Sequence, residues 1–297
     1  MKADWLDVIG CPSCQHALRF DNGASSSLFC HTCSSQYSIR NGTPVMLGEG
    51  NLEVLTEFNQ EYKRRRLTEG WRSLTAEESL ALPNGRPAGY PNIYWEVRRQ
   101  SYDALRSYLT KQGPLPSMGP VADLGAGNGW LSYNLARCGY RVMAVDSSID
   151  EPFGLGAADS YHSQKAFLVV QGDLNRPPLQ TGKFSLVLFN ASLHYAKDIY
   201  TSLKGTVQAL LPKGRVVILD SPIARKPRSG SDIGDRQFGR QELQDALVSS
   251  GLHPHWISVQ RGPRWWVMQA SRMVRGESTF SLPMIVAEMG RDARQVY

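Results

Sequence analysis

The chain has 297 residues, of which 41% are hydrophobic and 20% are charged, a composition typical of a globular protein rather than a disordered one. No apolar run is long enough to span a bilayer, and Asp4 stands where a signal peptide would turn apolar, so we expect a cytoplasmic protein without membrane contact. The net charge is +6, and the C-terminal part is more basic than the N-terminal part, since residues 1–50 hold three basic and four acidic side chains, whereas 221–297 hold 11 basic and 7 acidic ones.

Two Cys-x2-Cys pairs lie near the N-terminus, Cys11 with Cys14 and Cys30 with Cys33. Each pair can direct two thiolates at one ion, and two pairs complete a tetrahedral zinc site without an open position for chemistry. Disulfides, or cysteines without a metal, are the alternative, which is weaker in a chain without an export signal. Because fifty residues bury little core, we expect a structural zinc ion to supply much of the folding energy of this segment.

The cysteine pairs and the stretch YSIRNGTPVML at 37–47 are similar to the short zinc-ribbon proteins that activate tRNA- and ribosome-modifying methyltransferases. They also resemble the ribbon of certain ribosomal RNA guanine-N1 methyltransferases, which tend to use a histidine in the second pair, where this chain has Cys33. The resemblance implies a zinc-ribbon domain over residues 1–50. Its net acidity favours packing or substrate gating over a grip on phosphates.

Residues 51–92 are interpreted as a connector, with a charged helical stretch followed by turn signals rich in Pro and Gly. The basic run Lys63–Arg66 lies among glutamates, which favours a solvated helix face over a nucleic-acid contact. A further helix is expected from about Ile93 to Leu109, with one buried apolar stripe.

A short apolar run ends at Leu124 and leads into three alternating glycines, Gly125, Gly127 and Gly129, before a helical pattern begins. This order predicts a strand, a tight turn and a helix start, the place at which open α/β sheets bind ligands. A dinucleotide-binding turn needs a small residue where this chain has Trp130, so that class of cofactor is excluded.

Alternating strand and helix patterns continue to the C-terminus and predict a doubly wound, mostly parallel α/β sheet. Packing of Trp265 and Trp266 against this sheet is favoured over base stacking. Strands are expected at Val121–Leu124, Arg141–Asp146, Ala166–Val170, Phe184–Phe189, Arg215–Asp220, His255–Gln260 and Phe280–Glu288, and helices at Asp198–Leu211 and Gln241–Ser250.

The pattern acid-x-Gly-x-Gly-x-Gly resembles motif I of the class I S-adenosylmethionine (SAM) methyltransferases. This resemblance implies a seven-stranded sheet whose last two strands form a hairpin, in a domain over residues 93–297. On the same analogy, Tyr94 and Arg98 would contact the carboxylate of SAM, with surface packing as the alternative. Cofactor contacts are expected at Asp123, Gly125, Ala126, Gly127, Gly129, Asp146, Asp173, Leu174 and Asn190.

Two of these acids follow directly from the strand pattern. Asp146 ends the second strand, 17 residues after Gly129, where a carboxylate can accept hydrogen bonds from both ribose hydroxyls. Asp173 follows the third strand, where a carboxylate can accept from an adenine amino group, with a plain loop cap as the alternative.

The segment Asn190–Tyr195 follows the fourth strand and should face the glycine turn. It lacks the Asn/Asp-Pro-Pro-Tyr/Phe tetrad of amino-methylating nucleic-acid enzymes, which argues against an adenine or cytosine amino acceptor. His194 is the candidate general base or substrate ligand, with a structural histidine as the alternative, and Tyr195 is the second candidate catalytic residue.

A long polar loop, residues 225–240, carries five basic and two acidic residues and leaves the carboxyl end of the fifth strand. Its charge fits an anionic acceptor, and equally a solvated loop. The sequence therefore predicts a SAM-dependent methyltransferase that acts on an O or N nucleophile of a small metabolite. The basic loop is compatible with an anionic metabolite. The alternatives are a ribosomal or transfer RNA base N-methyltransferase, and a SAM-binding scaffold or activator subunit without chemistry.

Overall fold

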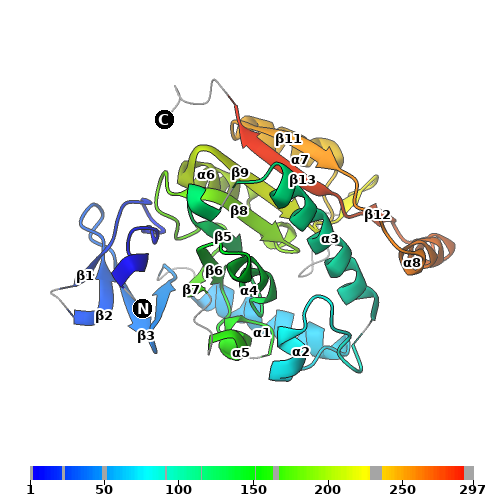
Figure 1. Cartoon of the computed structure of the whole chain (residues 1–297), viewed down its shortest axis with the longest axis horizontal. Coiled ribbons are helices and arrows are strands. Elements are labelled where there is room, and N and C mark those ends of the chain that lie inside the picture. The colour runs from blue at the N-terminus through cyan, green and yellow to red at the C-terminus, as the bar shows by residue number, and fades with distance from the viewer. Residues whose placement is uncertain are drawn as a thin grey trace.

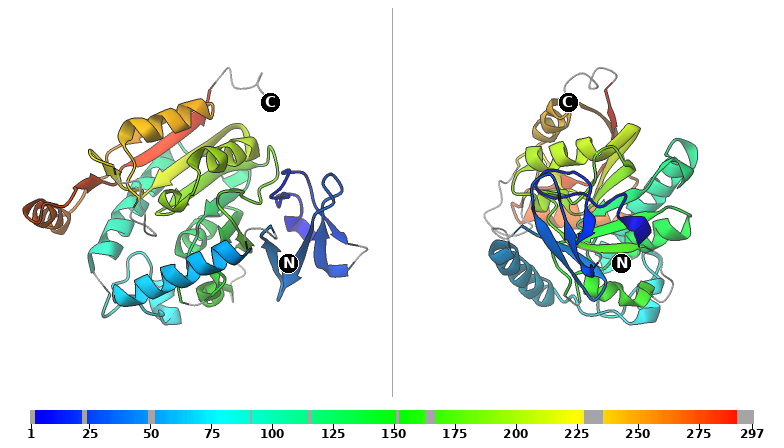
Figure 2. Two further views of the ribbon diagram at one scale, coloured as in Figure 1. Left: turned by 180° about the vertical axis from the view of Figure 1, so that it is seen from behind. Right: turned by 90° about the vertical axis from the view of Figure 1, so that its left-hand side faces the viewer.

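The computed structural model describes residues 3–21, 24–48, 52–90, 92–114, 116–150, 152–162, 167–227 and 236–290. One continuous sheet of eleven strands runs through these ranges, and helices cover both of its faces (Figures 1 and 2). Within the same ranges, no helix is long and apolar enough to cross a membrane.

Seven strands form the central part of the sheet, in the spatial order β7-β6-β5-β8-β9-β13-β11. Among these seven, β13 alone runs opposite to the other six, and it pairs antiparallel with both β9 and β11; helix α8 (Pro263–Val274) lies in the connection between the two strands of the expected hairpin. The predicted fold class is confirmed. The seven are β5 (Val121–Leu124), β6 (Val142–Asp146), β7 (Leu168–Gly172), β8 (Phe184–Asn190), β9 (Leu210–Leu219), β11 (Leu252–Ile257) and β13 (Met284–Met289).

The chain order reverses between β5 and β8, since β6 and β7 lie on one side of β5 and β8 lies on the other. In doubly wound sheets a crevice opens at this point, outside the carboxyl ends of the strands. Both faces of the sheet are covered, so β8 is a nearly unbroken buried run.

Two apolar cores lie on the two faces of the sheet. One core contains Leu105 and Leu131, from helices α3 (Asn92–Lys111) and α4 (Trp130–Arg137). The other contains Leu203 and Leu247, from α6 (Ile199–Ala209) and α7 (Arg240–Ser249). The remaining helices are α1 (Leu52–Thr68), α2 (Ala76–Leu80), α5 (Asp159–His162), α8 (Pro263–Val274) and 3-10 turns at Ala3–Trp5, Pro116–Met118, Leu155–Ala158 and Leu193–Tyr195.

The N-terminal segment extends the central sheet. Its antiparallel strands are β1 (Arg19–Asp21), β2 (Ala24–Phe29), β3 (Gln36–Arg40) and β4 (Thr43–Met46). Strand β4 then pairs in parallel with β7, with Val45 opposite Gln171. A bridge between Ile9 and Leu179 makes a second junction, and both side chains are fully buried. The predicted domain boundary at residue 50 stays a prediction, but the sheet continues across it.

Three strand predictions differ from the structure. Strand β9 begins at Leu210 rather than Arg215, because residues 211–214 are an irregularity in its pairing with β8 and do not end the strand. Gly251, with φ of 80°, ends α7 and lets β11 begin at once rather than at His255. Pro283 interrupts the last strand, leaving a two-residue strand β12 (Phe280–Ser281) that pairs with β10 (Ile223–Ala224) ahead of β13.

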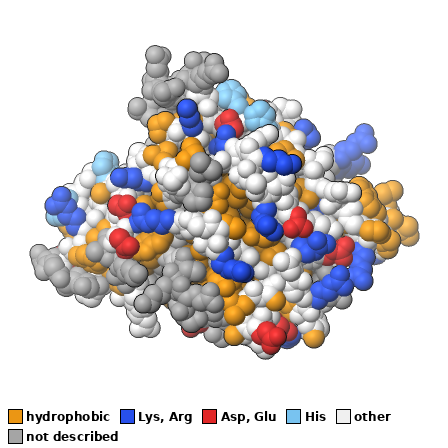
Figure 3. Space-filling view, in the orientation of Figure 1, with side chains coloured by type: hydrophobic (Ala, Val, Ile, Leu, Met, Phe, Trp, Pro, Cys, Tyr) orange, Lys and Arg blue, Asp and Glu red, His pale blue; other side chains and the backbone are white. Residues whose placement is uncertain are grey.

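Helix α8 protrudes at one end of the molecule (Figure 1). Trp265 is buried and packs edge-on against Phe280, with ring centroids 5.5 Å apart, as expected. Trp266 is 63% exposed, so the packing prediction is wrong for this residue. It shares the outer face of α8 with exposed Val267 and Met273, where apolar side chains gather (Figure 3).

Candidate active site

The turn after β5 requires glycine at three alternate positions. Gly125, Gly127 and Gly129 have φ angles of 72°, 55° and 79°, in the left-handed region that other residues rarely adopt. A Cβ atom at Gly125 would lie 2.4 Å from the Cβ of Ser192. The turn therefore uses glycine for its conformation and, at Gly125, also for the close approach of the segment after β8.

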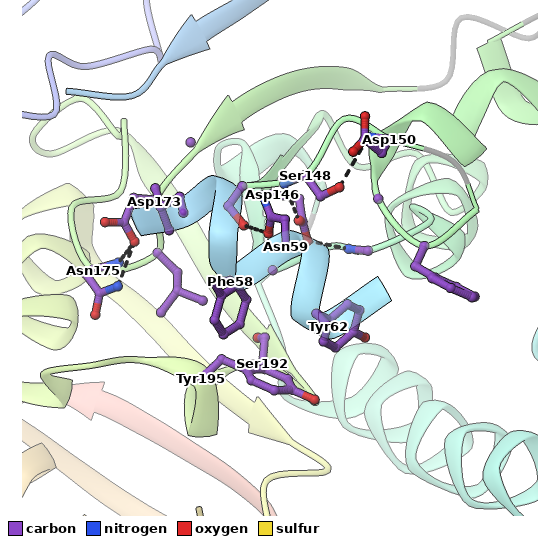
Figure 4. A pocket seen from close by; sticks show the side chains of 18 of the residues that line it. Phe58, Asn59, Tyr62, Asp146, Ser148, Asp150, Asp173, Asn175, Ser192 and Tyr195 are labelled. Carbon is purple, nitrogen blue, oxygen red and sulfur yellow. Dashed lines mark hydrogen bonds between the residues drawn. The ribbon is translucent and has the colours of Figure 1, made fainter. Parts of the chain in front are cut away.

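A first cavity lies between this turn, α1 and the carboxyl ends of β6, β7 and β8 (Figure 4). Helix α1 covers it with one face, from which Phe58 and Tyr62 point toward Tyr195. The two α1 rings also contact the Tyr195 ring, with centroids 5.9 Å and 5.6 Å away. The opposite wall is polar and contains Asp146 and Asp173. The cavity therefore has an aromatic side and an acidic side.

Asp146 is held in place by the turn that it faces. Its two carboxylate oxygens accept hydrogen bonds from the backbone N–H of Gly127 at 2.8 Å and of Ser148 at 2.9 Å. Burial raises the pKa of Asp146 to about 6, so the group is largely ionised at pH 7. An ionised carboxylate has about four acceptor positions, so two remain for a diol in the cavity.

The end of β7 supplies the second acid. Asp173 Oδ1 accepts from the backbone N–H of Asn175 at 2.8 Å and from its side-chain Nδ2 at 2.7 Å. Both bonds fall on one oxygen and orient the carboxylate beside Leu174, which also lines the cavity. Asp173 thus combines the predicted ligand position with the loop-cap geometry that was the alternative.

A second cavity opens on the other side of the glycine turn, between α1 and α3. Its wall contains two arginines, Arg66 and Arg98, and the rings of Trp71 and Trp95. The predicted residues Ala126 and Asn190 line this cavity rather than the first. The two cavities meet at residues that line both: Tyr62, Gly125, Gly127, Phe153 and Ala191.

Arg66 turns inward, so the prediction of a solvated basic face at 63–66 is wrong for this residue. It donates a hydrogen bond to the Tyr195 hydroxyl at 3.0 Å and pairs with Glu69 at 2.7 Å. Its guanidinium also lies over the rings of Tyr62, at 4.8 Å, and Trp71, at 5.1 Å. These aromatic partners come from outside the basic run, so local composition could not indicate them.

Arg98 and Tyr94, both on α3, differ in position. Arg98 lines the second cavity, and its guanidinium lies 5.0 Å from the ring centroids of both Trp71 and Trp95. Tyr94 is 42% exposed and packs beside Trp71 without lining either cavity. Of the two residues considered for an anionic group, only Arg98 faces the site.

The two candidate catalytic residues lie at different depths. Tyr195 lines the first cavity, whereas the buried His194 lines neither. Burial, together with the positive charges of Arg66 and Arg98, lowers the pKa of His194 to about 3. Its Nδ1 atom has no hydrogen-bond partner among the described residues. His194 is therefore a neutral imidazole of low basicity at physiological pH, and its catalytic role stays a prediction.

Two predicted cofactor residues lie behind the turn. Asp123 is 1% exposed, and the Ser132 hydroxyl of α4 donates to its Oδ2 at 2.7 Å, so that Asp123 joins β5 to the helix. Burial raises the pKa of Asp123 to about 7. Gly129 begins α4 and packs near Phe167. Neither Asp123 nor Gly129 is among the described residues that line the two cavities.

The basic loop at 225–240 is described only at its two ends, and 228–235 lie outside the described residues. Arg236 donates to the backbone carbonyl of Ala196 at 3.0 Å and pairs with Glu242 at 3.1 Å. Arg240 lies over the Trp256 ring at 4.4 Å. These two arginines therefore anchor the end of the loop to the domain.

The four predicted metal ligands lie together in the N-terminal segment, beside its contact with the central domain. The Sγ atoms of Cys11, Cys14, Cys30 and Cys33 all lie within 4.8 Å of one another. Contacts of 3.4 Å to 3.5 Å between them are close to the sulfur spacing of a tetrahedral thiolate site with ~2.3 Å metal–sulfur bonds. The Tyr37 hydroxyl lies 3.2 Å from Cys11 Sγ, as an outer-shell partner would.

Helix α1 is the part of the site that sequence reasoning missed. Phe58, Tyr62 and Arg66 are spaced four residues apart, so they share one face of a helix and meet the two cavities. Asn59, on the adjacent face, accepts a hydrogen bond from Ser147 at 2.8 Å. The aromatic spacing was the available signal, but the surrounding charges favoured a solvated helix.

Comparison with known proteins matches the family of methyltransferase domains at residues 122–218. A malonyl-[acyl-carrier protein] O-methyltransferase of Enterobacter lignolyticus is 28% identical over 138 residues, which are 46% of this chain and 51% of that protein. The chain thus spans about half the length of the methyltransferase relatives that it matches. A UPF0434 protein of Burkholderia mallei is 45% identical over 47 residues, 16% of this chain and 68% of that protein.

Solved structures with the same fold include the Brevibacillus brevis O-methyltransferase of a trans-AT polyketide synthase with S-adenosyl-L-homocysteine. It has a TM-score of 0.51 and 14% identity, covering 74% of this chain and 82% of that one. A chain in the complex of the Haloferax volcanii Trm112 methyltransferase activator with a candidate methyltransferase has a TM-score of 0.51 and 19% identity, with coverage of 66% and 92%. The chain therefore contains a methyltransferase domain with the class I fold, preceded by a four-cysteine segment that is similar to the UPF0434 proteins.

Proposed function

We propose that this protein binds SAM in the first cavity and transfers its methyl group to a small anionic molecule in the second. The observation that carries the proposal is the junction of the two cavities at the glycine turn, with acidic groups on one side and arginines on the other. Asp146 would bind the ribose hydroxyls, and Asp173 with Leu174 would hold the adenine. The sulfonium would then lie near the junction, at Gly125 and Ala191.

Alignment accounts for most of the proposed catalysis. When bound, SAM supplies an activated methyl group on a positively charged sulfur, so the protein needs chiefly to orient the acceptor. The turn, whose conformation is held by Asp146, would position the cofactor. The rings of Phe58 and Tyr62 would exclude water from the reacting atoms.

A small acceptor is favoured over RNA by the pairing of two arginines on α1. Arg64 and Arg66 pair with Glu61 and Glu69, and α1 covers the first cavity. A duplex or loop of RNA would instead require a row of cations free to contact phosphates. RNA base methylation remains the second candidate, because the four-cysteine segment resembles ribbons that serve RNA-modifying enzymes. A SAM-binding scaffold without chemistry is the third.

We further propose that the four cysteines hold a structural Zn²⁺ and that their segment supports the cofactor site in cis. The similar fold in the Trm112 complex occurs beside a separate activator, whereas here the four-cysteine segment is part of the same chain and adds β4 to the sheet. Strand β4 pairs with β7, directly before Asp173. Metal binding would thereby stabilise the strand that presents this acid.

The test is methyl transfer from tritiated SAM into a cell extract separated into RNA and small molecules, after S-adenosylhomocysteine binding has been measured by calorimetry. We expect binding, and label in the small-molecule fraction. Label in RNA that is abolished by nuclease would support the second candidate instead. Binding without label in either fraction would support the scaffold, and absence of binding would refute the proposed cofactor site.

A further inference from the structure

The second cavity contains a guanidinium that no carboxylate contacts directly among the described residues. Three arginines lie in or beside it, and two of them are paired: Arg66 with Glu69, and Arg261 with Asp220 at 3.2 Å. Arg98 forms no ion pair within 4.0 Å among the described residues, and its buried Nη1 atom has no hydrogen-bond partner there; the Asp220 carboxylate, which is paired with Arg261, acts on Arg98 only at longer range. Burial lowers the pKa of Arg98, yet a guanidinium stays protonated at neutral pH. An enclosed cation of this kind is costly without a counter-ion.

The wall of this cavity also contains no group that could take up a proton at neutral pH. Its titratable side chains are those of Tyr62, Arg66, Tyr90 and Arg98, with no Asp, Glu, His, Lys or Cys among the described lining residues. His194 is not among these lining residues, and burial lowers its pKa to about 3. An acceptor that must lose a proton to react, such as an alcohol or a protonated amine, would find no base here.

We propose that the acceptor is a carboxylate, held by Arg98 between Trp71 and Trp95 and methylated on oxygen. This inference rests on the proposed function and narrows its substrate to a carboxylic acid. One oxygen accepts a hydrogen bond from Arg98 Nη1, and the other attacks the methyl carbon of SAM. The methyl–sulfur bond breaks, and its electron pair stays on sulfur. The products are a methyl ester and S-adenosylhomocysteine, and no proton moves.

The charges of the reactants explain why an anionic acceptor suits this place. Bound SAM brings a sulfonium, and its amino-acid part is a zwitterion, so the cofactor adds net positive charge beside Arg66 and Arg98. A carboxylate compensates that charge before the reaction. Transfer removes the sulfonium and the carboxylate charges together, so the neutral ester loses its attraction to Arg98 and is released.

The carboxylate of SAM is the alternative partner for Arg98. An Arg98→Met variant distinguishes it from an acceptor carboxylate. Loss of a hydrogen bond to a charged group predicts a fall in kcat/KM for the acceptor of about 10- to 100-fold. The affinity for S-adenosylhomocysteine should stay within about twofold of the parent value. An equal loss in both quantities would assign Arg98 to the cofactor and overturn the proposal.

Arg99→Met is the matched control, since Arg99 is the next residue of α3, is more exposed and pairs with Asp103 at 3.2 Å. We expect this variant to keep the acceptor kinetics of the parent. Because Arg98 has no direct ion pair in the described structure and its buried Nη1 lacks a hydrogen-bond partner, Arg98→Met should leave Tm unchanged or raise it. Suppose instead that Arg98→Met lowers Tm, and that Arg98→Lys restores Tm but not kcat/KM. This result would mark Arg98 as structural and overturn its role in binding the acceptor.

The chemistry is tested on the small-molecule fraction of an extract with tritiated SAM. A methyl ester releases volatile tritiated methanol in mild base, whereas N-methyl groups and ethers retain their label. Amidation of the carboxyl groups in the extract before the assay should abolish incorporation. Base-stable label, or incorporation that survives amidation, would overturn the carboxylate and leave the proposed function intact. Failure to bind S-adenosylhomocysteine would instead refute the proposed function.

Discussion

The close approach of the glycine turn to the segment after β8 can be tested by Gly125→Ala. The added Cβ would lie 2.4 Å from Ser192 Cβ, and φ at this position is 72°. The Ser192 hydroxyl donates to the carbonyl of Leu124 at 2.5 Å, so Ser192 cannot move away without breaking that bond. The left-handed conformation costs about 1–2 kcal/mol for alanine, and overpacking adds about 1–3 kcal/mol.

Gly182→Ala is the matched control, because Gly182 has φ of 67° and a Cβ added there would meet nothing within 4 Å. Denaturant unfolding should show a loss of about 1–2 kcal/mol for the control and of about 2–5 kcal/mol for Gly125→Ala. Calorimetry should show S-adenosylhomocysteine affinity falling by about tenfold in Gly125→Ala alone. Equal losses of stability in the two variants, with affinity unchanged in both, would refute the argument from close approach.

Three further results are expected. Affinity for S-adenosylhomocysteine should fall by about 10- to 100-fold in Asp146→Asn. In the parent protein this affinity should weaken as pH drops through about 6, where the Asp146 carboxylate gains its proton. An affinity that calorimetry finds constant from pH 5 to 8 would contradict the role of Asp146 in binding the ribose. Chelation of the metal, or Cys14→Ser, should lower both Tm and cofactor affinity. Unchanged values would exclude support of the cofactor site by the four-cysteine segment. His194→Gln should retain at least about a tenth of the methyl-transfer rate, since general bases contribute about 10²–10⁴-fold and this one is not basic; a loss of a hundredfold would restore His194 as the base.

The glycine turn and the two acids could be predicted because they are encoded locally. An apolar run followed by alternating glycines determines a strand and a left-handed turn within ten residues. Asp146 and Asp173 end the next two strands, and parallel strands bring their carboxyl ends to the same edge. Once the strands were identified, the position of these two acids followed from the strand order, but the α1 side of the first cavity did not.

The second cavity could not be predicted, because it depends on contacts between distant segments. Arg66 and Tyr195 are 129 positions apart in sequence. The composition of the basic run Lys63–Arg66 is also that of an ordinary solvated helix face, so it does not indicate that Arg66 faces a cavity. Nothing in the local pattern of β4 indicates that it will pair with the edge of β7. Edge pairing is determined by which strand is left uncovered in the finished fold.

The four-cysteine segment and the cover of the first cavity are mechanically linked. Strand β4 ends at Met46 and α1 begins at Leu52, so five residues join them. A link of this length spans at most about 20 Å, which tethers the start of α1 to the β7 edge. The side chain of Asn59 then fixes α1 to Ser147, next to Asp146.

Loss of the metal would therefore reach the cofactor site by two routes, through β7 and Asp173, and through the start of α1. A Val45→Pro variant tests the first route, because proline fixes φ at about −65° and distorts β4 where it lies opposite Gln171, while the cysteines stay intact. We expect it to lower cofactor affinity with the metal still bound, as measured by metal analysis beside calorimetry. Parent-like affinity in this variant would leave the α1 tether as the connection between the metal and the site.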